Sequence, residues 1–161
     1  MPSTNNSSQL SSLSANLGGK TAIVTGSSID IDAGIAVDLG RRGAAVVITY
    51  TSERSRDAAY SVAKTIDDSI SGGKGLPASP QDTIDILIHN AADGEDRFLE
   101  DVTGEFFNKM TDLNLKGVYD PRVVPHMPRG GRIVLITSAA ARMGVTQKSV
   151  YVVTKAGHKA F

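Results

Sequence analysis

The chain lacks cysteine, its charges cancel, and none of its apolar segments is long enough to cross a membrane. It has 161 residues, with 17 basic and 17 acidic side chains and a formal net charge of zero. The absence of cysteine excludes disulfides and thiolate metal sites, and it fits a reducing, cytoplasmic compartment. A net charge of zero gives no electrostatic case for nucleic acid or an anionic membrane as a partner. The short apolar runs exclude a membrane-spanning helix.

The first sixteen residues are rich in serine and asparagine. They contain no basic segment followed by a long apolar one, so they do not read as a secretory signal, and they lack the arginines of a mitochondrial one. This composition predicts a disordered tail over residues 1–16. The remaining residues, 17–161, are enough for one domain with its own core.

Short β-branched segments alternate with segments of helical composition along the rest of the chain. This alternation predicts βαβ units and a parallel sheet. We expect strands at Thr21–Val24, Ala45–Tyr50, Ile84–His89 and Ile133–Ile136, and helices at Ala33–Arg42, Arg54–Ile70, Glu105–Val118 and from Ser149 onward.

A serine, a tyrosine and a lysine near the end of the chain could form an acid–base device. Ser138 follows an apolar run that reads as a buried strand, and active sites of open α/β sheets lie at the carboxyl ends of strands. Tyr151 and Lys155 are four residues apart, which places them on one face of a helix. A lysine ammonium one turn away favours the phenolate form of a tyrosine. Alone, this spacing is common on amphipathic helices and is more often structural.

Five segments in sequence resemble the motifs of one known family, the short-chain dehydrogenases/reductases. They are Lys20–Gly26, Asp85–Ala92, Asp112–Gly117, Gly130–Ser138 and Tyr151–Lys155. The resemblance runs from about Leu17 to Phe161 and implies an α/β, Rossmann-like doubly wound parallel sheet. It also implies an NADP(H)-dependent oxidoreductase that reduces a small-molecule carbonyl, or oxidises an alcohol, by hydride transfer. The segments Ile48–Tyr50 and Gly131–Leu135 further resemble fungal polyketide or naphthol reductases of secondary metabolism.

The resemblance assigns a role to each member of the catalytic set. Tyr151 is implied to be the proton donor or acceptor, and Ser138 to orient and polarise the carbonyl. Lys155 is implied to hold the nicotinamide ribose and to favour the ionised tyrosine. Asn114 is implied to hold a water that links the lysine to solvent.

The cofactor-binding residues implied by the family pattern are Gly26, Ile31, Ser52, Asn90, Lys116, Tyr151 and Lys155. At the end of the second strand, hydroxyl side chains and Arg54 suit a 2′-phosphate, which favours NADP over NAD. Glu53 could reverse this preference, and the same segment could simply be a polar loop that caps the next helix. Lys116 could equally be a solvated surface residue.

The phosphate-binding turn departs from the family pattern. After Gly26, the two further glycines of the pattern are replaced by Asp30 and Asp32. Carboxylates at a helix N-terminus favour the helix dipole, but they oppose a bound pyrophosphate. We therefore expect NADP(H) to bind weakly. A metal site that includes Asp38 is a weaker alternative, because no other ligand cluster is evident.

The domain is expected to be incomplete. It lacks the family's C-terminal strands, and a Gly/Pro-containing linker at Gly72–Thr83 stands where the third strand and the following helix are expected. A stunted strand at Gly75–Ala78 is the alternative. Either the helix at Arg54–Ile70 docks on the opposite face or this linker crosses the sheet, because a left-handed crossover is very rare. The partner classes left open are a homo-oligomer or association with a full-length relative. A catalytically impaired pseudoenzyme or interaction remnant is the alternative function.

Overall fold

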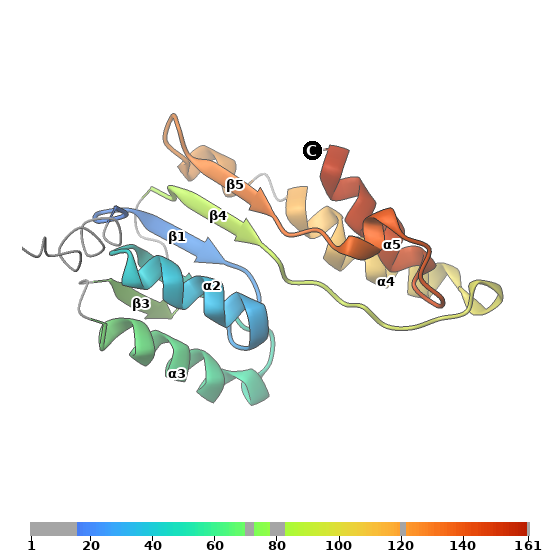
Figure 1. The fold of residues 1–161 in the computed structure, drawn as a ribbon, viewed down its shortest axis with the longest axis horizontal. Coiled ribbons are helices and arrows are strands. Elements are labelled where there is room, and N and C mark those ends of the chain that lie inside the picture. The colour runs from blue at the N-terminus through green and yellow to red at the C-terminus, as the bar shows by residue number, and fades with distance from the viewer. Residues whose placement is uncertain (1–15, 70–72, 78–82, 120–121, 161) are drawn as a thin grey trace, which may run out of the picture.

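The computed structural model describes residues 16–69, 73–77, 83–119 and 122–160, so most of the expected tail lies outside the described residues. Within them, five parallel strands form one sheet in the order β3-β2-β1-β4-β5 (Figure 1). The Rossmann-like fold class is therefore confirmed. The strands are β1 (Thr21–Val24), β2 (Ala45–Ile48), β3 (Lys74–Pro77), β4 (Ile86–His89) and β5 (Arg132–Leu135); the α-helices are α2 (Asp30–Arg41), α3 (Arg56–Asp67), α4 (Gly104–Asn114) and α5 (Ser149–Gly157).

Helices α2 and α3 cover one face of the sheet and form the main core. Apolar residues of β1, β2 and β4 meet alanines and an isoleucine of these helices. Strand β2 is buried on both faces, which is typical of the middle of a parallel sheet. The fully or nearly fully buried members of this core are Ala22, Val24, Ala36, Ala44, Val46, Ile48, Ala59, Ala63, Ile66 and Ile88.

The expectation that the third strand is missing is wrong. Residues Lys74–Pro77 form β3 and pair in parallel with the whole of β2, from Ala45↔Lys74 to Ile48↔Pro77. Gly75 lies so close to α3 that an added Cβ would be 2.5 Å from Ala63 Cα. The glycines that read as a linker therefore permit close packing between strand and helix. Helix α3 packs beside α2, so it does not dock on the opposite face of the sheet. Residues 78–82 of the expected linker lie outside the described residues.

Helices α4 and α5 pack against each other beyond the carboxyl ends of β4 and β5 (Figure 1). Phe106 and Met110 of α4 and Val150 of α5 form a small second core. Thr103 caps α4 by accepting a hydrogen bond from the Phe106 N–H. Short 3₁₀ turns lie at Glu53–Ser55, Leu99–Asp101, Lys116–Tyr119, Val124–His126, Ala139–Arg142 and His158–Ala160. None of the helices in the described ranges is long and apolar enough to cross a membrane.

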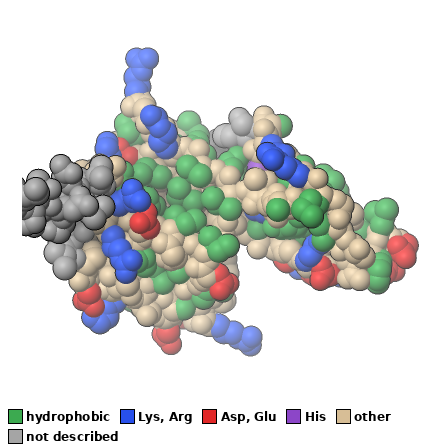
Figure 2. Space-filling view, viewed as in Figure 1, with side chains coloured by type: hydrophobic (Ala, Val, Ile, Leu, Met, Phe, Trp, Pro, Cys, Tyr) green, Lys and Arg blue, Asp and Glu red, His purple; other side chains and the backbone are tan. Residues whose placement is uncertain are grey.

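Strand β5 is an apolar edge. Among the described residues it pairs with β4 alone, and Val134 is 40% exposed. Val134 pairs with Ile88 and so lies on the face that α2 and α3 cover farther along the sheet. Figure 2 shows apolar side chains gathered in the middle of this face, where the helices do not reach. Within the described residues, β5 is therefore an exposed edge of the sheet.

Two glycines of α2 provide a test of the packing between α2 and α3. Gly40→Ala is expected to lower the free energy of unfolding by about 1–3 kcal/mol, because an added Cβ would lie 2.4 Å from Ile66 Cγ2. Gly34→Ala is the matched control, because no atom lies within 4 Å of a Cβ there. It is expected to raise the stability by about 0.5–1 kcal/mol. Urea unfolding of both variants measures the difference, and equal effects would contradict the packing described.

Candidate active site

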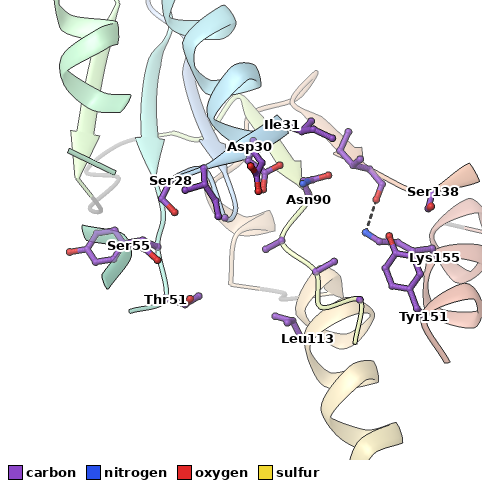
Figure 3. Close-up of a pocket in the computed structure, with 18 of the residues that line it drawn as sticks. Ser28, Asp30, Ile31, Thr51, Ser55, Asn90, Leu113, Ser138, Tyr151 and Lys155 are labelled. Carbon is purple, nitrogen blue, oxygen red and sulfur yellow. Dashed lines mark hydrogen bonds between the residues drawn. The ribbon is translucent and has the colours of Figure 1, made fainter. Parts of the chain in front are cut away.

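A cavity of about 600 Å³ lies at the carboxyl ends of the strands, where the chain order of the sheet reverses around β1. Ligands of open α/β sheets bind at such switch points. Gly26 follows β1 and Asn90 follows β4, and both line the cavity. Figure 3 shows the end of β2 at one end of the cavity and Ser138, Tyr151 and Lys155 at the other. The N-terminus of α2 lies between these two ends.

Three of the four predicted catalytic side chains line the same end of this cavity. Ser138 stands directly before the 3₁₀ turn Ala139–Arg142, and its Oγ accepts a hydrogen bond from the Ala140 N–H at 3.2 Å. Its own O–H is therefore left to donate to a ligand. The Tyr151 ring has two ammonium groups nearby, with Lys155 Nζ 6.0 Å and Lys148 Nζ 5.9 Å from the ring centroid.

Lys155 is buried although it carries a charge. It is 2% exposed, and its Nζ donates a hydrogen bond to the Ile136 carbonyl at 2.9 Å. Burial lowers the pKa of Lys155, and the nearby Asp32 carboxylate opposes this change. The lysine is thus held at the end of β5 with hydrogen-bonding capacity left for a ligand in the cavity.

Several hydrogen bonds fix the helix that carries Tyr151 and Lys155. Thr137 Oγ1 donates to the Lys155 carbonyl at 2.6 Å, which ties α5 to the end of β5. The Nε2 atom of His158 lies 2.6 Å from the Asn114 carbonyl oxygen, which ties α5 to α4. His158 and His89 are both buried and meet edge to face, with ring centroids 6.2 Å apart.

Asn114 is fully buried behind the cavity rather than lining it. Its Oδ1 accepts from the Asp93 N–H at 2.8 Å, and its Nδ2 donates to the Asp93 carbonyl at 2.8 Å and to Thr154 Oγ1 at 3.3 Å. The side chain therefore joins the loop after β4 to α4 and α5. The Asp93 partner is not visible in the sequence, because the two residues are 21 positions apart.

The structure brings together some of the predicted cofactor residues and leaves others outside. Gly26, Ile31 and Asn90 line the cavity with Tyr151 and Lys155. Ser52 does not line it, and its neighbours Thr51 and Ser55 do so instead. The 3₁₀ turn Glu53–Ser55 explains this shift, because the Ser52 hydroxyl is engaged with Ser55 Oγ at 3.2 Å.

Lys116 also lies away from the cavity. Its side chain is 69% exposed and forms an ion pair with Asp112 on the preceding turn. Of the two interpretations of this residue, its position fits a solvated surface side chain.

The turn between β1 and α2 from Gly26 to Asp32, called the phosphate turn below, has a glycine-like backbone at Asp30. This residue has φ 57°, a left-handed conformation that glycine adopts freely and that other residues adopt at a cost. Its side chain is exposed. Helix α2 begins here, earlier than the Ala33 start expected from composition, so both aspartates fall in its first turn.

Asp32 is the more unusual of the two aspartates. It is 7% exposed, its Oδ1 has no hydrogen-bond partner, and an added Cβ at Gly26 would lie 2.9 Å from its Oδ2. Burial raises the pKa of the Asp32 carboxyl; Asn90 and Lys155 act in the opposite direction, and Asp30 adds to the increase. No group of three or more potential metal-ligating side chains gathers in the described part of the chain.

Comparison with known proteins identifies the family. Residues 78–161 match the family described as short chain dehydrogenase. The chain belongs to this family. Short-chain dehydrogenase/reductase FrzI of Cladobotryum sp is 37% identical over 153 residues, covering 85% of this chain and 59% of that protein. Hydroxynaphthalene reductase-like protein Arp2 of Metarhizium majus (strain ARSEF 297) is 30% identical over 162 residues, covering 90% of this chain and 61% of that protein.

Two solved structures also resemble this short-chain dehydrogenase in fold and sequence. The promiscuous reductase LugOII, which catalyses keto-reduction at C1 during lugdunomycin biosynthesis, superimposes with a TM-score of 0.82 and 31% identity, covering 91% of this chain and 70% of that chain. The angucycline C-6 ketoreductase LanV with bound NADP superimposes with a TM-score of 0.82 and 31% identity, covering 91% of this chain and 65% of that chain. The resemblance to fungal naphthol-type reductases is confirmed, and the chain spans about 60% of the length of these curated relatives.

The residues at the two ends of the cavity suit a nicotinamide dinucleotide, but the residues between these ends do not. Hydroxyls of Thr51 and Ser55 lie at one end, and Tyr151 and Lys155 lie at the other. At the N-terminus of α2, between these ends, an ionised Asp32 would oppose the cofactor's pyrophosphate.

The role of Asn114 as a connection between α4, α5 and the loop after β4 can be tested directly. Asn114→Ala is expected to lower the free energy of unfolding by roughly 2–4 kcal/mol, because it leaves the Asp93 N–H and carbonyl without their partners. Asn108→Ala, at an exposed position of the same helix, is the control and is expected to change the stability by less than about 0.5 kcal/mol. Chemical denaturation of both variants gives the comparison, and a small effect at both positions would show that Asn114 is dispensable.

The buried Asp32 predicts a particular pH dependence of stability. Because its pKa is higher in the folded than in the unfolded chain, its ionisation costs stability as the pH rises through the folded value. Asp32→Asn is therefore expected to raise the melting temperature near about pH 8, by about 2–4 °C for each kcal/mol gained. The gain should disappear below the unfolded pKa. Asp38→Asn, at an exposed position of α2, should show no such gain at about pH 8.

Proposed function

We propose that this chain is part of an NADP(H)-dependent carbonyl reductase, or of the corresponding alcohol dehydrogenase, with Tyr151 as its acid–base group. One observation carries the proposal. Ser138, Tyr151 and Lys155 line one end of a cavity that continues past the phosphate turn to the end of β2. A family fold alone does not define an activity, whereas convergent polar groups in one cavity support a specific reaction.

Ser138, Tyr151 and Lys155 have different roles in the proposed carbonyl reduction. A bound nicotinamide supplies the hydride for the carbonyl carbon. The Ser138 O–H is free to donate to the carbonyl oxygen, since its Oγ accepts from the Ala140 N–H. The Tyr151 hydroxyl delivers the proton to that oxygen, and the Lys155 ammonium stabilises the phenolate that remains. In alcohol oxidation the same groups act in reverse.

The preference for NADP over NAD rests on the end of β2 and on a relative. Thr51 and Ser55 line the cavity where a 2′-phosphate would lie, and no acidic side chain from this strand end lines it. The similar ketoreductase LanV is described with bound NADP. Asn90 and Gly26 complete the cofactor side of the cavity.

The names of the relatives point to the substrate class. They include a hydroxynaphthalene reductase-like protein and an angucycline C-6 ketoreductase. We infer that a polycyclic aromatic ketone, or the keto tautomer of a hydroxynaphthalene, is the substrate of the protein to which this chain corresponds.

The alternative function is that of a catalytically impaired member of the family that acts through binding to another protein. The observation that favours it is the pair of aspartates at the phosphate turn, because an ionised carboxylate there repels a pyrophosphate. The exposed edge of β5 adds a surface on which a full-length relative, or a second copy of the chain, could pair.

Replacement of Tyr151 tests the proposed function. NADPH oxidation is followed spectroscopically with a hydroxynaphthalene or a polycyclic aromatic ketone as substrate. Tyr151→Phe is expected to lower kcat by about 10²–10⁴-fold, because it removes the proton donor and keeps the ring. NADPH affinity, measured by equilibrium binding, should change little.

Tyr60→Phe is the matched control. Tyr60 is 48% exposed on α3 and does not line the cavity, so the rate should stay at the wild-type value. If the wild-type chain binds NADPH but turns over none of these substrates, the impaired-relative alternative is favoured. Equal rates for wild type and Tyr151→Phe would rule out Tyr151 as the acid.

A further inference from the structure

The phosphate turn contains a buried polar atom that has no partner. Asp32 lies in the first turn of α2, is 7% exposed, and lines the cavity, and its Oδ1 makes no hydrogen bond. A helix N-terminus presents free N–H groups that attract an anion such as a pyrophosphate. The chain thus places an acceptor-only carboxylate where an anionic ligand also needs donors.

A carboxyl group changes from acceptor to donor when it takes up one proton. As a neutral acid, Asp32 would no longer repel a pyrophosphate in the cavity. The backbone of the turn needs no change for this, because Gly26 keeps its left-handed φ of 76° and Asp30 adopts a glycine-like φ of 57°.

We propose that NADP binds this chain together with a proton that is taken up by Asp32, so that cofactor affinity rises as the pH falls. This inference rests on the proposed function, and in particular on NADP as the cofactor. The protonation of Asp32 then determines the pH range in which NADP binds.

The charged and titratable groups around Asp32 come from three elements. Asp30 is on the same turn of α2 and favours the neutral carboxyl, and Lys155 on α5 favours the ionised one. Tyr50 at the end of β2 and Tyr151 on α5 line the same cavity. The neutral Asn90 side chain, after β4, also favours the ionised form.

The effects of these groups lead to a clear expectation. Burial has the largest effect on the free chain and raises the pKa of Asp32. A bound pyrophosphate adds negative charge to the same place and raises it further, so binding and protonation favour each other. When one proton accompanies each ligand, affinity increases by up to about tenfold for each unit of pH.

Isothermal titration calorimetry with NADP⁺ tests this inference without any turnover. Titrations in two buffers of different ionisation enthalpy, between about pH 5 and about pH 8, count the protons taken up with the cofactor. We expect wild type to take up more protons than Asp32→Asn, by up to one per cofactor. The 2′-phosphate of NADP⁺ titrates near about pH 6 and contributes equally to both chains.

Asp30→Asn is the matched control, because it removes an equal charge from the same turn at an exposed position and asparagine tolerates the left-handed conformation. It removes the favourable effect of Asp30 on the neutral Asp32 carboxyl, so the uptake should move to a lower pH range, but the extra proton should be retained. Asp32→Gly is the second neutral variant, used if Asp32→Asn does not fold, and should lose the extra proton as well.

The outcomes separate the inference from the proposed function. Equal proton counts for wild type and the Asp32 variants, with cofactor bound by all, would overturn the inference and leave the proposed function standing. Binding by the Asp32 variants alone would also overturn it, because Asp32 would then reject the cofactor at every pH. If no variant binds NADP⁺ at any pH, NADP as the cofactor fails and the inference fails with it.

Discussion

The paired hydrogen bonds between Asn114 and the backbone of Asp93 hold α4, α5 and the loop after β4 together. Asn114 is fully buried, and its amide satisfies both the N–H and the carbonyl of Asp93 while it also reaches Thr154. Helix α5, which carries Tyr151 and Lys155, makes few contacts with the sheet and lies beyond the strand ends (Figure 1). Its position therefore depends on α4, on this amide, and on Thr137 at the end of β5. Buried polar networks of this kind fix one arrangement only when every member has a partner.

Buried charged groups are paired differently in two parts of the cavity. At the catalytic end, a buried ammonium has an acceptor in the Ile136 carbonyl, and a serine is oriented by a backbone N–H. At the phosphate turn, a buried carboxylate oxygen has no partner at all. The opposite charges of Lys155 and Asp32 act on each other across the cavity. A change of charge at Asp32 therefore alters the electrostatic environment of Lys155, so the two residues are coupled before any ligand binds.

Much of this arrangement follows from the sequence because it rests on local periodicity. A tyrosine and a lysine four apart share a helix face, and a serine after an apolar strand lies at the carboxyl edge of the sheet. The roles of Asp93 and His158 could not be predicted, because their partner Asn114 is distant in sequence. Strand β3 was missed because Gly75 and Pro77 are poor strand formers. Pairing with β2 and close packing on Ala63 override that propensity. The lining by Thr51 and Ser55 in place of Ser52 could not be predicted, because it depends on the 3₁₀ turn that follows Ser52.

The left-handed backbone at Asp30 bears on the evolutionary history of the turn. Aspartate and glycine codons differ by a single base, and the φ of 57° is one that glycine occupies without strain. The ancestral-type residue could therefore return at this position without moving the chain around it. Glycine at this position would remove the cost of the left-handed conformation without a change in the path of the backbone.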